Sequence, residues 1–384
     1  MTDRRRLLSR ALGSLAAAGS AWWWRASREE TAPGAVTAVL RDGEHNEGFE
    51  RVLGPRPFEF PRDHAAHPGF RHEWWYVTGH LADGARREYG FQLTFFRYAL
   101  TPRAVESISR WRSRDIVLAH FALTDVAAQR FHHATRRARA ALDIAGADDR
   151  TPRVWIRDWM LALDAHDAQR WLLQADAGGH ALSLALTAAK PVVLQGDRGY
   201  SRKSDAAGNA SHYYSIPRLD VAGSVRLGTA NLQVSGHAWL DREWGTSALG
   251  AGQQGWDWFA LQLADGRELT FYRLRDLAGR TDPHSRGLLI DARGTTTPLR
   301  AQDVVLEPAR WWRSPETGIE YPLDWRVRAP GAGLELELRA RVDAQEWTDE
   351  LRYWEGQVEV RGRDGGKGIK GLGYLEMTGY DAAT

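Results

Sequence analysis

The fold is decided by residues 236–259, which read GHAWLDREWGTSALGAGQQGWDWF. This stretch sets His237, Asp241, Glu243 and Asp257 among four tryptophans. Charged side chains are costly to bury unless they are paired or needed, and tryptophan brings a large apolar surface with a defined face. Acidic groups between aromatic walls are typical of a ligand pocket or a reaction chamber.

An internal repeat places this stretch at the junction of two similar modules. The corresponding segments are 74–84 with 256–266, 93–97 with 269–273, 213–214 with 353–354, and 236–241 with 371–376. In the first pair, WWYVTGHLADG aligns with WDWFALQLADG. Blocks that recur in the same order are not expected by chance. The sequence therefore predicts two copies of one module, a first domain over 50–244 and a second over 245–384.

Strand-length segments fill both modules. Apolar or alternating runs such as 258–263 are separated by glycine, proline and Asp-Gly pairs. Asp83-Gly84 and Asp265-Gly266 favour hairpin turns, and no long amphipathic helical pattern follows the N-terminal segment. The chain is therefore predicted to be all-β, with strands that close into barrels.

Composition and the N-terminal segment indicate an exported globular protein. The 384 residues carry a formal net charge of +2 with scattered basic residues, which argues against a nucleic-acid partner. No cysteine is present, so disulfides and thiol chemistry are excluded. Residues 1–27 join a twin arginine (Arg4, Arg5) to an alanine-rich apolar run and are predicted to be a twin-arginine export signal, followed by a linker over 28–49. We expect a periplasmic protein, either released or anchored by an uncleaved signal.

Comparison of the two copies separates functional candidates from shared scaffold. At four positions a chemically capable residue replaces a bland one: Asp257 against Trp75, His237 against Leu372, Glu73 against Gly255, and His80 against Gln262. By contrast, Asp241 aligns with Glu376, so both copies keep an acid there. A shared acid favours a structural role, and Arg242 and Glu243 beside it are expected to be junction scaffold as well.

Strand alternation predicts an inward-facing Asp257. Within 256–263, Asp257 shares one face with Phe259 and Leu261. If that face lines a barrel interior, burial raises the pKa of the carboxyl and keeps it protonated near neutral pH. Two interpretations stay open, a catalytic acid or a structural carboxylate that accepts hydrogen bonds from a turn or pairs with an arginine such as Arg242. For Glu73, the alternative to catalysis is a buried salt bridge that fixes the first strand.

The histidines do not predict a metal site. His72-Glu73 begins like a zinc-protease motif, but Tyr76 stands where the second histidine ligand is required. His64, His67 and His72 lie around a turn, with no regular element to bring them together. The chain also lacks a dinucleotide-binding fingerprint and a phosphate-binding loop.

Ordered motifs from residue 55 to the end resemble the carotenoid 1,2-hydratase (hydroxyneurosporene synthase) superfamily, and most closely its secreted, lipocalin-like AttH-type branch. The motifs are HEWWY at 72–76, AHF at 119–121, YYS at 213–215, GHAWLDREWG at 236–245, WDW at 256–258 and GYLEMTGY at 373–380. The resemblance implies two lipocalin-like β-barrels in tandem, which agrees with the repeat.

The resemblance also implies a reaction, the addition of water to a terminal alkene of an isoprenoid or polyene-like substrate. An acid protonates carbon and water captures the cation, which aromatic faces stabilise by roughly 1–2 kcal/mol each when desolvated. The catalytic acid and its aromatic partners fall at Asp257, His237 and Trp239, with Glu73 as a further catalytic candidate. No metal or organic cofactor is implied. Contacts with the hydrophobic substrate are expected from Trp239, Trp256, Trp258, Trp75, Tyr76, His120 and Tyr214.

Two functions remain open on this basis. The first is a cofactor-free acid/base enzyme, a lyase of the hydratase type, with an apolar pocket near the domain junction. The alternative is a non-catalytic periplasmic carrier of a lipophilic small molecule, linked to a membrane-adjacent export or ABC-transport system. The oligomeric state is not predicted by either interpretation.

Overall fold

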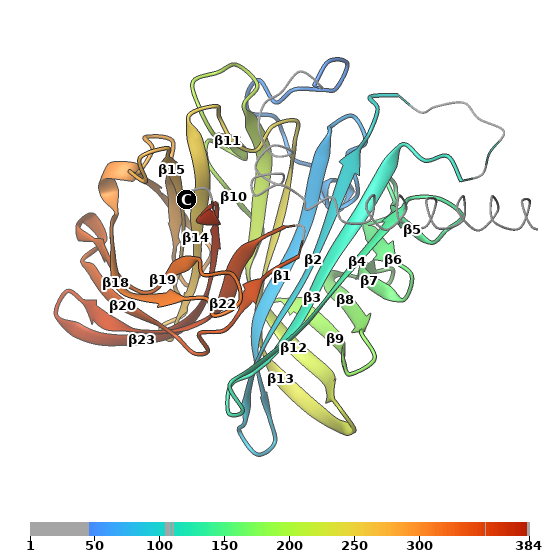
Figure 1. Ribbon diagram of the computed structural model, residues 1–384. Coiled ribbons are helices and arrows are strands. Elements are labelled where there is room, and N and C mark those ends of the chain that lie inside the picture. The colour runs from blue at the N-terminus through green and yellow to red at the C-terminus, as the bar shows by residue number, and fades with distance from the viewer. Residues whose placement is uncertain (1–45, 104–108, 110, 350, 382–384) are drawn as a thin grey trace, which may run out of the picture. The chain divides into compact units, whose positions relative to one another are not determined.

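The computed structural model describes residues 46–103, 109, 111–349 and 351–381. The predicted export signal, residues 1–27, and most of the predicted linker lie outside the described residues. Within the described ranges, no helix is long and apolar enough to cross a membrane. The regular structure there consists of antiparallel strands in two sheets and three short 3-10 helices (Figure 1).

Among the described residues, thirteen strands form the first sheet. They are β1 (His72–Asp83), β2 (Glu88–Ala99), β3 (Asp115–Asp125), β4 (Arg130–Arg139), β5 (Ala145–Ala147), β6 (Arg153–Ile156), β7 (Trp159–Asp164), β8 (Asp167–Asp176), β9 (His180–Ala188), β10 (Val193–Leu194), β11 (Tyr200–Arg202), β12 (Ala210–Leu227) and β13 (Ala230–Gly245). Their order is β4-β3-β2-β1-β13-β12-β9-β8-β7-β6-β5, and β10 and β11 pair with β12. The helix η1 (Arg62–His64) precedes β1. The sheet curls until β3 and β4 contact β5 and β6.

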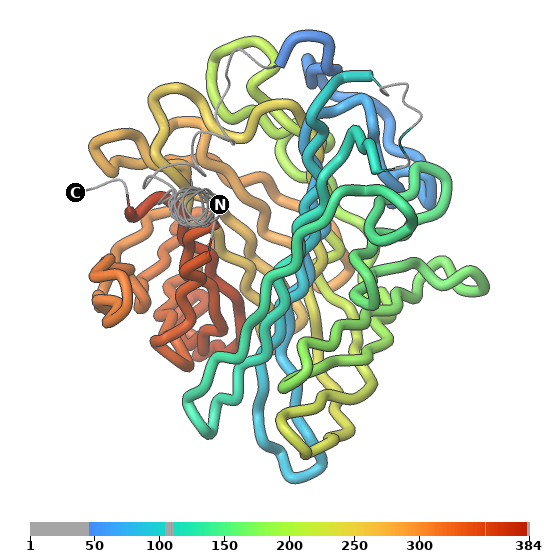
Figure 2. The backbone as a smooth tube through the Cα atoms, turned by 45° about the vertical axis from the view of Figure 1, so that its right-hand side comes forward, coloured from blue at the N-terminus to red at the C-terminus, as the bar shows by residue number. Residues whose placement is uncertain are grey.

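The second sheet has ten strands within the described ranges. They are β14 (Gln253–Leu263), β15 (Glu268–Asp276), β16 (Arg286–Ile290), β17 (Thr296–Arg300), β18 (Val305–Arg313), β19 (Glu320–Ala329), β20 (Leu334–Ala340), β21 (Glu346–Trp347), β22 (Tyr353–Asp364) and β23 (Lys367–Thr378), with η2 (Ala301–Asp303) and η3 (Pro330–Ala332) between them. The order is β17-β16-β15-β14-β23-β22-β20-β19-β18, and β21 pairs with β22. Figure 2 shows the second sheet, in orange and red, curling separately from the first. The prediction of an all-β chain with two tandem lipocalin-like barrels is confirmed.

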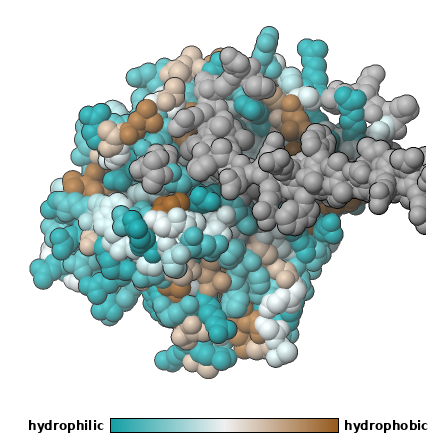
Figure 3. Space-filling model, viewed as in Figure 1, coloured by the Kyte–Doolittle hydropathy of each residue, from teal (hydrophilic) through white to brown (hydrophobic). Residues whose placement is uncertain are grey.

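Each barrel is filled by one face of its own strands. Trp75 and Val77 of β1 pack with Leu93 of β2 in the first core, whereas Phe259 and Leu261 of β14 lie in the second. Alternate residues of a strand point to opposite faces, so the polar or aromatic residues between these positions point out of the barrels. On the face shown in Figure 3 hydrophilic residues predominate and hydrophobic patches are scattered.

The two sheets pack together through these outward faces. Tyr76 of β1, Tyr213 of β12 and Trp239 of β13 form one buried cluster with Trp258 of β14 and Tyr374 of β23. The strands at the centre of each sheet therefore have no solvated face, because one side fills a barrel and the other side meets the second sheet.

Two equivalent glycines allow close strand packing in the two modules. A Cβ on Gly236 of β13 would overlap the carbonyl oxygen of His80 in the neighbouring β1. Gly371, its counterpart in the repeat, lies beside β14, and a Cβ there would stand 2.5 Å from the carbonyl oxygen of Gln262. Both contacts are with backbone, which cannot rotate away as a side chain can.

We predict that Gly236→Ala and Gly371→Ala each lower the free energy of unfolding by about 1–3 kcal/mol, because an inserted methyl group forces the strands apart. Urea denaturation measures the change. Gly252→Ala is the control, since no atom lies within 4 Å of its added Cβ. Equal effects at all three positions would show that close packing is not the reason for the glycines.

Candidate functional site

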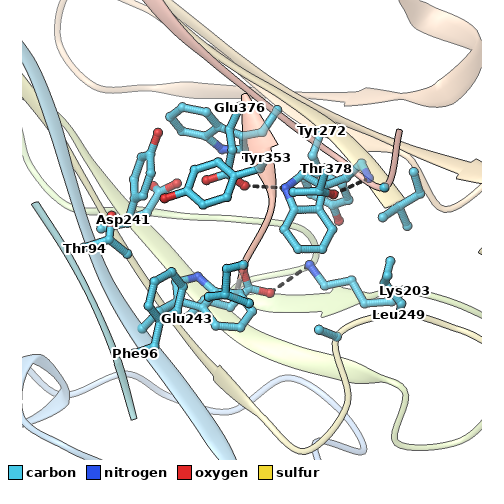
Figure 4. A pocket seen from close by; sticks show the side chains of 18 of the residues that line it. Thr94, Phe96, Lys203, Asp241, Glu243, Leu249, Tyr272, Tyr353, Glu376 and Thr378 are labelled. Carbon is cyan, nitrogen blue, oxygen red and sulfur yellow. Dashed lines mark hydrogen bonds and ion pairs between the residues drawn. The ribbon is translucent and has the colours of Figure 1, made fainter. Parts of the chain in front are cut away.

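A cavity opens between the two sheets, on the faces that the barrels turn toward each other. Its empty volume is about 1160 Å³, including its open mouth. Side chains from β1, β2, β12 and β13 line it on one side, and side chains from β14, β15, β22 and β23 line it on the other. Figure 4 shows these side chains converging on one space.

The cavity is lined by equivalent positions of the two repeats. The pairs are Trp74 with Trp256, Tyr76 with Trp258, Phe96 with Tyr272, Tyr213 with Tyr353, and Asp241 with Glu376. Each member of a pair occupies the same place in its own module, and both members line the same cavity. The repeat therefore creates the site, because two similar outward faces are brought together.

The aromatic wall is fixed by ring contacts within it and with Trp239 behind it. The rings of Tyr76 and Trp258 meet edge to face with centroids 5.0 Å apart, and Trp239 meets Trp258 at 6.2 Å. Trp258 Nε1 also donates a hydrogen bond to Tyr213 Oη at 3.2 Å. Edge-to-face pairs of this kind contribute about 0.5–1.5 kcal/mol beyond the area that they bury, so the wall is held in place before any ligand arrives.

Asp241 is a buried acid in this wall. Its carboxylate accepts hydrogen bonds from Tyr213 Oη at 2.6 Å, Trp239 Nε1 at 2.7 Å and Ser215 Oγ. Burial disfavours the charged form and raises the pKa of Asp241 to about 7, although the three hydrogen bonds oppose this effect. At neutral pH both the protonated and the charged form of this carboxyl are therefore populated.

Glu376 is the second acid of the cavity and comes from the second sheet. Trp256 Nε1 donates a hydrogen bond to one of its oxygens at 2.6 Å. Burial raises the pKa of Glu376 to about 7, and the negative charges of Asp241 and Glu243 add to the shift. Glu376 accepts fewer hydrogen bonds than Asp241 and is less completely buried, so it is the better placed of the two to give a proton to a ligand.

A third acid stands directly behind the cavity. Glu355 of β22 lies opposite Glu376 in the strand register, and Tyr76 Oη donates a hydrogen bond to it at 2.6 Å. Burial, followed by the nearby Glu376, raises the pKa of Glu355 well above its ordinary value. Burial therefore favours the neutral form of Glu355, which connects to the cavity through the Tyr76 hydroxyl.

Lys203 forms an ion pair in the wall of the cavity, which Arg352 also lines. Lys203 Nζ lies 2.8 Å from Glu243 and 4.5 Å from the centre of the Tyr272 ring. Burial alone would lower the pKa of Lys203, but Glu243, Tyr272 and Asp241 together outweigh burial and raise it. Glu243 thus forms an ion pair with Lys203, whereas Asp241 and Glu376 are held by hydroxyl and indole donors. The described ranges contain no group of three or more His, Asp or Glu side chains arranged to hold a metal ion.

This arrangement is suited to general acid/base chemistry on an apolar molecule. A carboxyl with a pKa near the working pH is protonated often enough to donate and acidic enough to transfer the proton. Faces of Trp74, Trp256 and Trp258 line the same space, where they can stabilise positive charge that develops on a ligand.

Some of the residues predicted to contact a substrate do line this cavity. Tyr76, Trp256 and Trp258 are in its wall. Trp239 lies behind the wall and hydrogen-bonds to Asp241, and His120 lies behind it too, with Nδ1 2.7 Å from Tyr353 Oη.

Asp257 faces the interior of the second barrel, as strand alternation predicts, but the cavity lies on the opposite face of β14. Its carboxylate forms ion pairs with Arg273 at 2.6 Å and Arg275 at 3.4 Å, and accepts a hydrogen bond from Tyr380 at 2.8 Å. Of the two interpretations left open for Asp257, the geometry corresponds to the carboxylate paired with arginine. The arginines come from β15, and neither is Arg242.

Glu73 lies inside the first barrel in a cluster of charges. It contacts Arg242 at 2.7 Å, Arg97 at 3.1 Å and His67 Nδ1 at 2.9 Å. Burial alone would raise the pKa of Glu73, but Arg242, His67 and Arg97 hold it well below its usual range. Arg242 also stacks on the Trp75 ring at 3.9 Å. Glu73 thus belongs to a buried salt-bridge cluster away from the cavity, and Trp75 packs against the arginine of that cluster.

The remaining predicted site residues also lie away from the cavity. His237 is half exposed and contacts Asp220 at 3.1 Å in a groove at the other end of the inter-sheet contact. Tyr214 is buried in the first barrel, where its hydroxyl meets His64 Nδ1 at 2.5 Å. The structure therefore does not bring Asp257, His237 and Glu73 together.

Sequence comparison of the repeats did not select Asp241, Glu376, Lys203 or Tyr272 as site residues. Asp241 and Glu376 had been set aside because both copies keep an acid. The acid that both copies keep at this position could itself have indicated the site. Equivalent outward-facing positions meet when two similar modules pack face to face. Lys203 lies in the segment between β11 and β12, outside the repeated blocks, and no pattern marks it.

Comparison with known proteins agrees with the class that the fold and the cavity define, a tandem lipocalin-like protein with an inter-barrel pocket. The AttH-like family model matches residues 51–380. A provisionally assigned AttH protein of Nitrosomonas europaea, known from a crystal structure, is 35% identical, with a TM-score of 0.78 over 86% of this chain and 100% of that one. This chain belongs to the AttH-like family, and the resemblance to the carotenoid 1,2-hydratase superfamily is confirmed.

Two curated relatives carry the names of enzymes that add or remove water, a hydratase and a dehydratase. Kievitone hydratase of Fusarium solani subsp. phaseoli is 29% identical over 44% of this chain and 49% of its own length. The dehydratase asqC of Emericella nidulans is 24% identical over 44% and 50%. The chain spans about half the length of these relatives. A kievitone hydratase structure from Nectria haematococca, 15% identical with a TM-score of 0.66 over 87% of this chain and 97% of that one, shares the fold.

We predict that Glu73→Gln lowers the free energy of unfolding by about 3–5 kcal/mol, because two buried arginines lose their carboxylate partner. Urea denaturation measures the loss. Glu59→Gln, which changes an exposed glutamate just before η1, is the matched control and leaves stability unchanged. A loss below about 1 kcal/mol for Glu73→Gln would contradict the assignment of Glu73 to scaffold.

Proposed function

We propose that this chain is an acid/base enzyme of the hydratase type, which adds water to an alkene of a hydrophobic, isoprenoid or polyene-like substrate held between the two sheets. The observation that carries the proposal is the pair Asp241 and Glu376, two acids with a pKa of about 7 in one aromatic-walled cavity. A surface carboxyl would be ionised at this pH and unable to donate.

Glu376 is assigned the role of general acid. Its carboxyl gives a proton to one alkene carbon, and the π electrons form the new carbon–hydrogen bond. The cation left on the other carbon lies among the faces of Trp74, Trp256 and Trp258, each of which contributes roughly 1–2 kcal/mol in a desolvated site. The negative charge left on Glu376 adds further electrostatic stabilisation.

Water then completes the reaction. A water molecule attacks the cation, and a carboxylate accepts the proton that it releases. Asp241 suits this step because it titrates near neutral pH and is oriented by Tyr213, Trp239 and Ser215. The alkene and water yield an alcohol, and the two acids share one proton at the start and at the end. These steps use side chains alone and are proposed to need no cofactor.

The relatives support the type of chemistry and not the substrate. Kievitone hydratase and the dehydratase asqC are named for adding and removing water, and these are the two directions of one reaction. Because this chain spans about half of their length, their substrates are candidates for assay only. We further propose a periplasmic location, supported by the N-terminal sequence.

We predict that Glu376→Gln lowers turnover by about a hundredfold or more, because a general acid contributes on that scale. Wild-type protein is incubated with kievitone and with neurosporene in isotopically labelled water, and mass spectrometry detects products that have gained one water. Binding of each probe, followed by tryptophan fluorescence, is retained in the variant, since an amide keeps the shape of the carboxyl.

Asp257→Asn is the matched control for this experiment. It removes a buried acid from β14, the strand that pairs with the strand of Glu376. Because Asp257 lies outside the cavity, turnover per folded molecule stays close to wild type. If Asp257→Asn abolishes turnover and Glu376→Gln does not, the assignment of the acid is wrong. Saturable binding of a probe without turnover by the wild-type protein would support the carrier instead.

The carrier is the second candidate, and the open cavity favours it. Its mouth is open and its walls carry many aromatic side chains, as a store for a lipophilic molecule requires. In that case the partner is proposed to be a membrane-adjacent export or ABC-transport system that loads or unloads the ligand.

A further inference from the structure

A row of polar side chains extends from the cavity along the contact between the two sheets. On β1, Tyr76, Thr78 and His80 point to this contact, because they alternate with core residues. On β22, Glu355 and Gln357 face them. Tyr76 Oη donates to Glu355 at 2.6 Å, and Gln357 Nε2 contacts His80 Nδ1 at 2.9 Å. Thr78 lies between these two cross-sheet contacts.

The far end of this row reaches a second hollow. A groove lined by His80, Gln357, Gly236, His237 and Arg341 has an empty volume of about 960 Å³, including its opening. His237 is half exposed there, so the groove communicates with solvent. The polar row thus joins two hollows that open at opposite ends of the inter-sheet contact.

The row contains oxygen atoms that lack partners. Thr78 Oγ1, Gln357 Oε1 and Glu355 Oε2 form no hydrogen bond with any described residue. The three side chains are 1%, 2% and 1% exposed. Buried polar atoms are almost always hydrogen-bonded, either to protein or to ordered water, and buried water occurs where several such atoms lie together.

Local packing keeps the Gln357 oxygen available. Gln357 Nε2 lies 2.9 Å from Tyr89 O and from His80 Nδ1, which fixes the amide with Oε1 as its free acceptor. Burial lowers the pKa of His80 to about 3, so the ring is neutral and accepts this hydrogen bond. Gly90 makes room for the arrangement, because a Cβ there would lie 2.6 Å from Gln357 Cδ and 2.6 Å from Tyr374 Oη.

We propose that a file of bound water occupies this row and links the groove beside His237 to the cavity at Tyr76. The water molecules bridge Gln357 Oε1, Thr78 Oγ1 and Glu355 Oε2. They carry protons between solvent and Glu355 without passing the cavity mouth. If the chain is a hydratase, the same file supplies the water that is added to the substrate. This role rests on the proposed function, whereas the proton path does not.

The test follows the exchange of the Glu355 proton. Neutral buried carboxyls give infrared carbonyl bands that shift in heavy water, and the band lost in Glu355→Gln identifies this residue. After transfer of wild-type protein to heavy water, the band shifts rapidly. Thr78→Val keeps the side-chain shape but removes the central hydroxyl. It slows the shift by about tenfold or more, because a water that loses its polar partner is no longer held in the row.

Two further variants make the outcome decisive. Thr124→Val removes a buried threonine hydroxyl on β3 that is bonded to Gln345 and to no member of the row, and it leaves the exchange rate unchanged. His80→Phe closes the groove end and slows exchange even if Thr78→Val does not fold.

Equal exchange rates in wild type, Thr78→Val and His80→Phe would overturn the proposal, as would a high-resolution crystal structure with no water at Thr78 and Gln357. The readout needs no substrate. The exchange experiment therefore tests the proposed water file independently of the proposed hydratase activity.

Discussion

The site depends on one constraint, that the two sheets pack through the outward faces of their central strands. Strand alternation gives β1, β13, β14 and β23 two buried faces, one in a barrel and one between the barrels. The face between the barrels carries acids and aromatic rings in addition to aliphatic side chains. Because the two modules are similar, this packing brings equivalent residues such as Asp241 and Glu376 into one cavity.

The partner of each buried acid decides what it can do. Glu73 and Asp257 face the barrel interiors and are matched by arginines, so they are ion pairs that hold strands together. Asp241 and Glu376 face the cavity and are matched by hydroxyl and indole donors. Without a cation in contact, burial raises the pKa of each to about 7. A buried acid on the barrel face of a sheet therefore has a structural role. A buried acid on the face between the sheets is able to transfer a proton.

The fold could be predicted from the sequence to a large extent. The repeated WWYVTGHLADG and WDWFALQLADG blocks predicted two modules, and turn residues predicted strands. Even the inward direction of Asp257 follows from alternation. The aromatic residues Tyr76, Trp256 and Trp258 were also predicted to contact a substrate, and they do line the cavity.

The choice of acids could not be made in the same way. Alternation says that residues share a face, but it does not say whether the ligand lies inside a barrel or between barrels. Arg273 and Arg275 lie one strand away from Asp257, and their pairing with it depends on the register of β14 with β15. Positions that the two copies share were interpreted as structural, and this interpretation excluded Asp241 and Glu376. It holds only if the shared faces of the two modules do not meet.

The central claim is that a neutral carboxyl is held in the inter-sheet cavity near pH 7. Infrared titration of the carbonyl band that disappears in Glu376→Gln tests it directly and without a substrate. The account predicts a band that persists at mildly acidic pH and is lost as the pH rises through about 7. A band lost near the ordinary glutamate value of 4.5 would contradict the account, because Glu376 would then be ionised at neutral pH and unable to act as the acid.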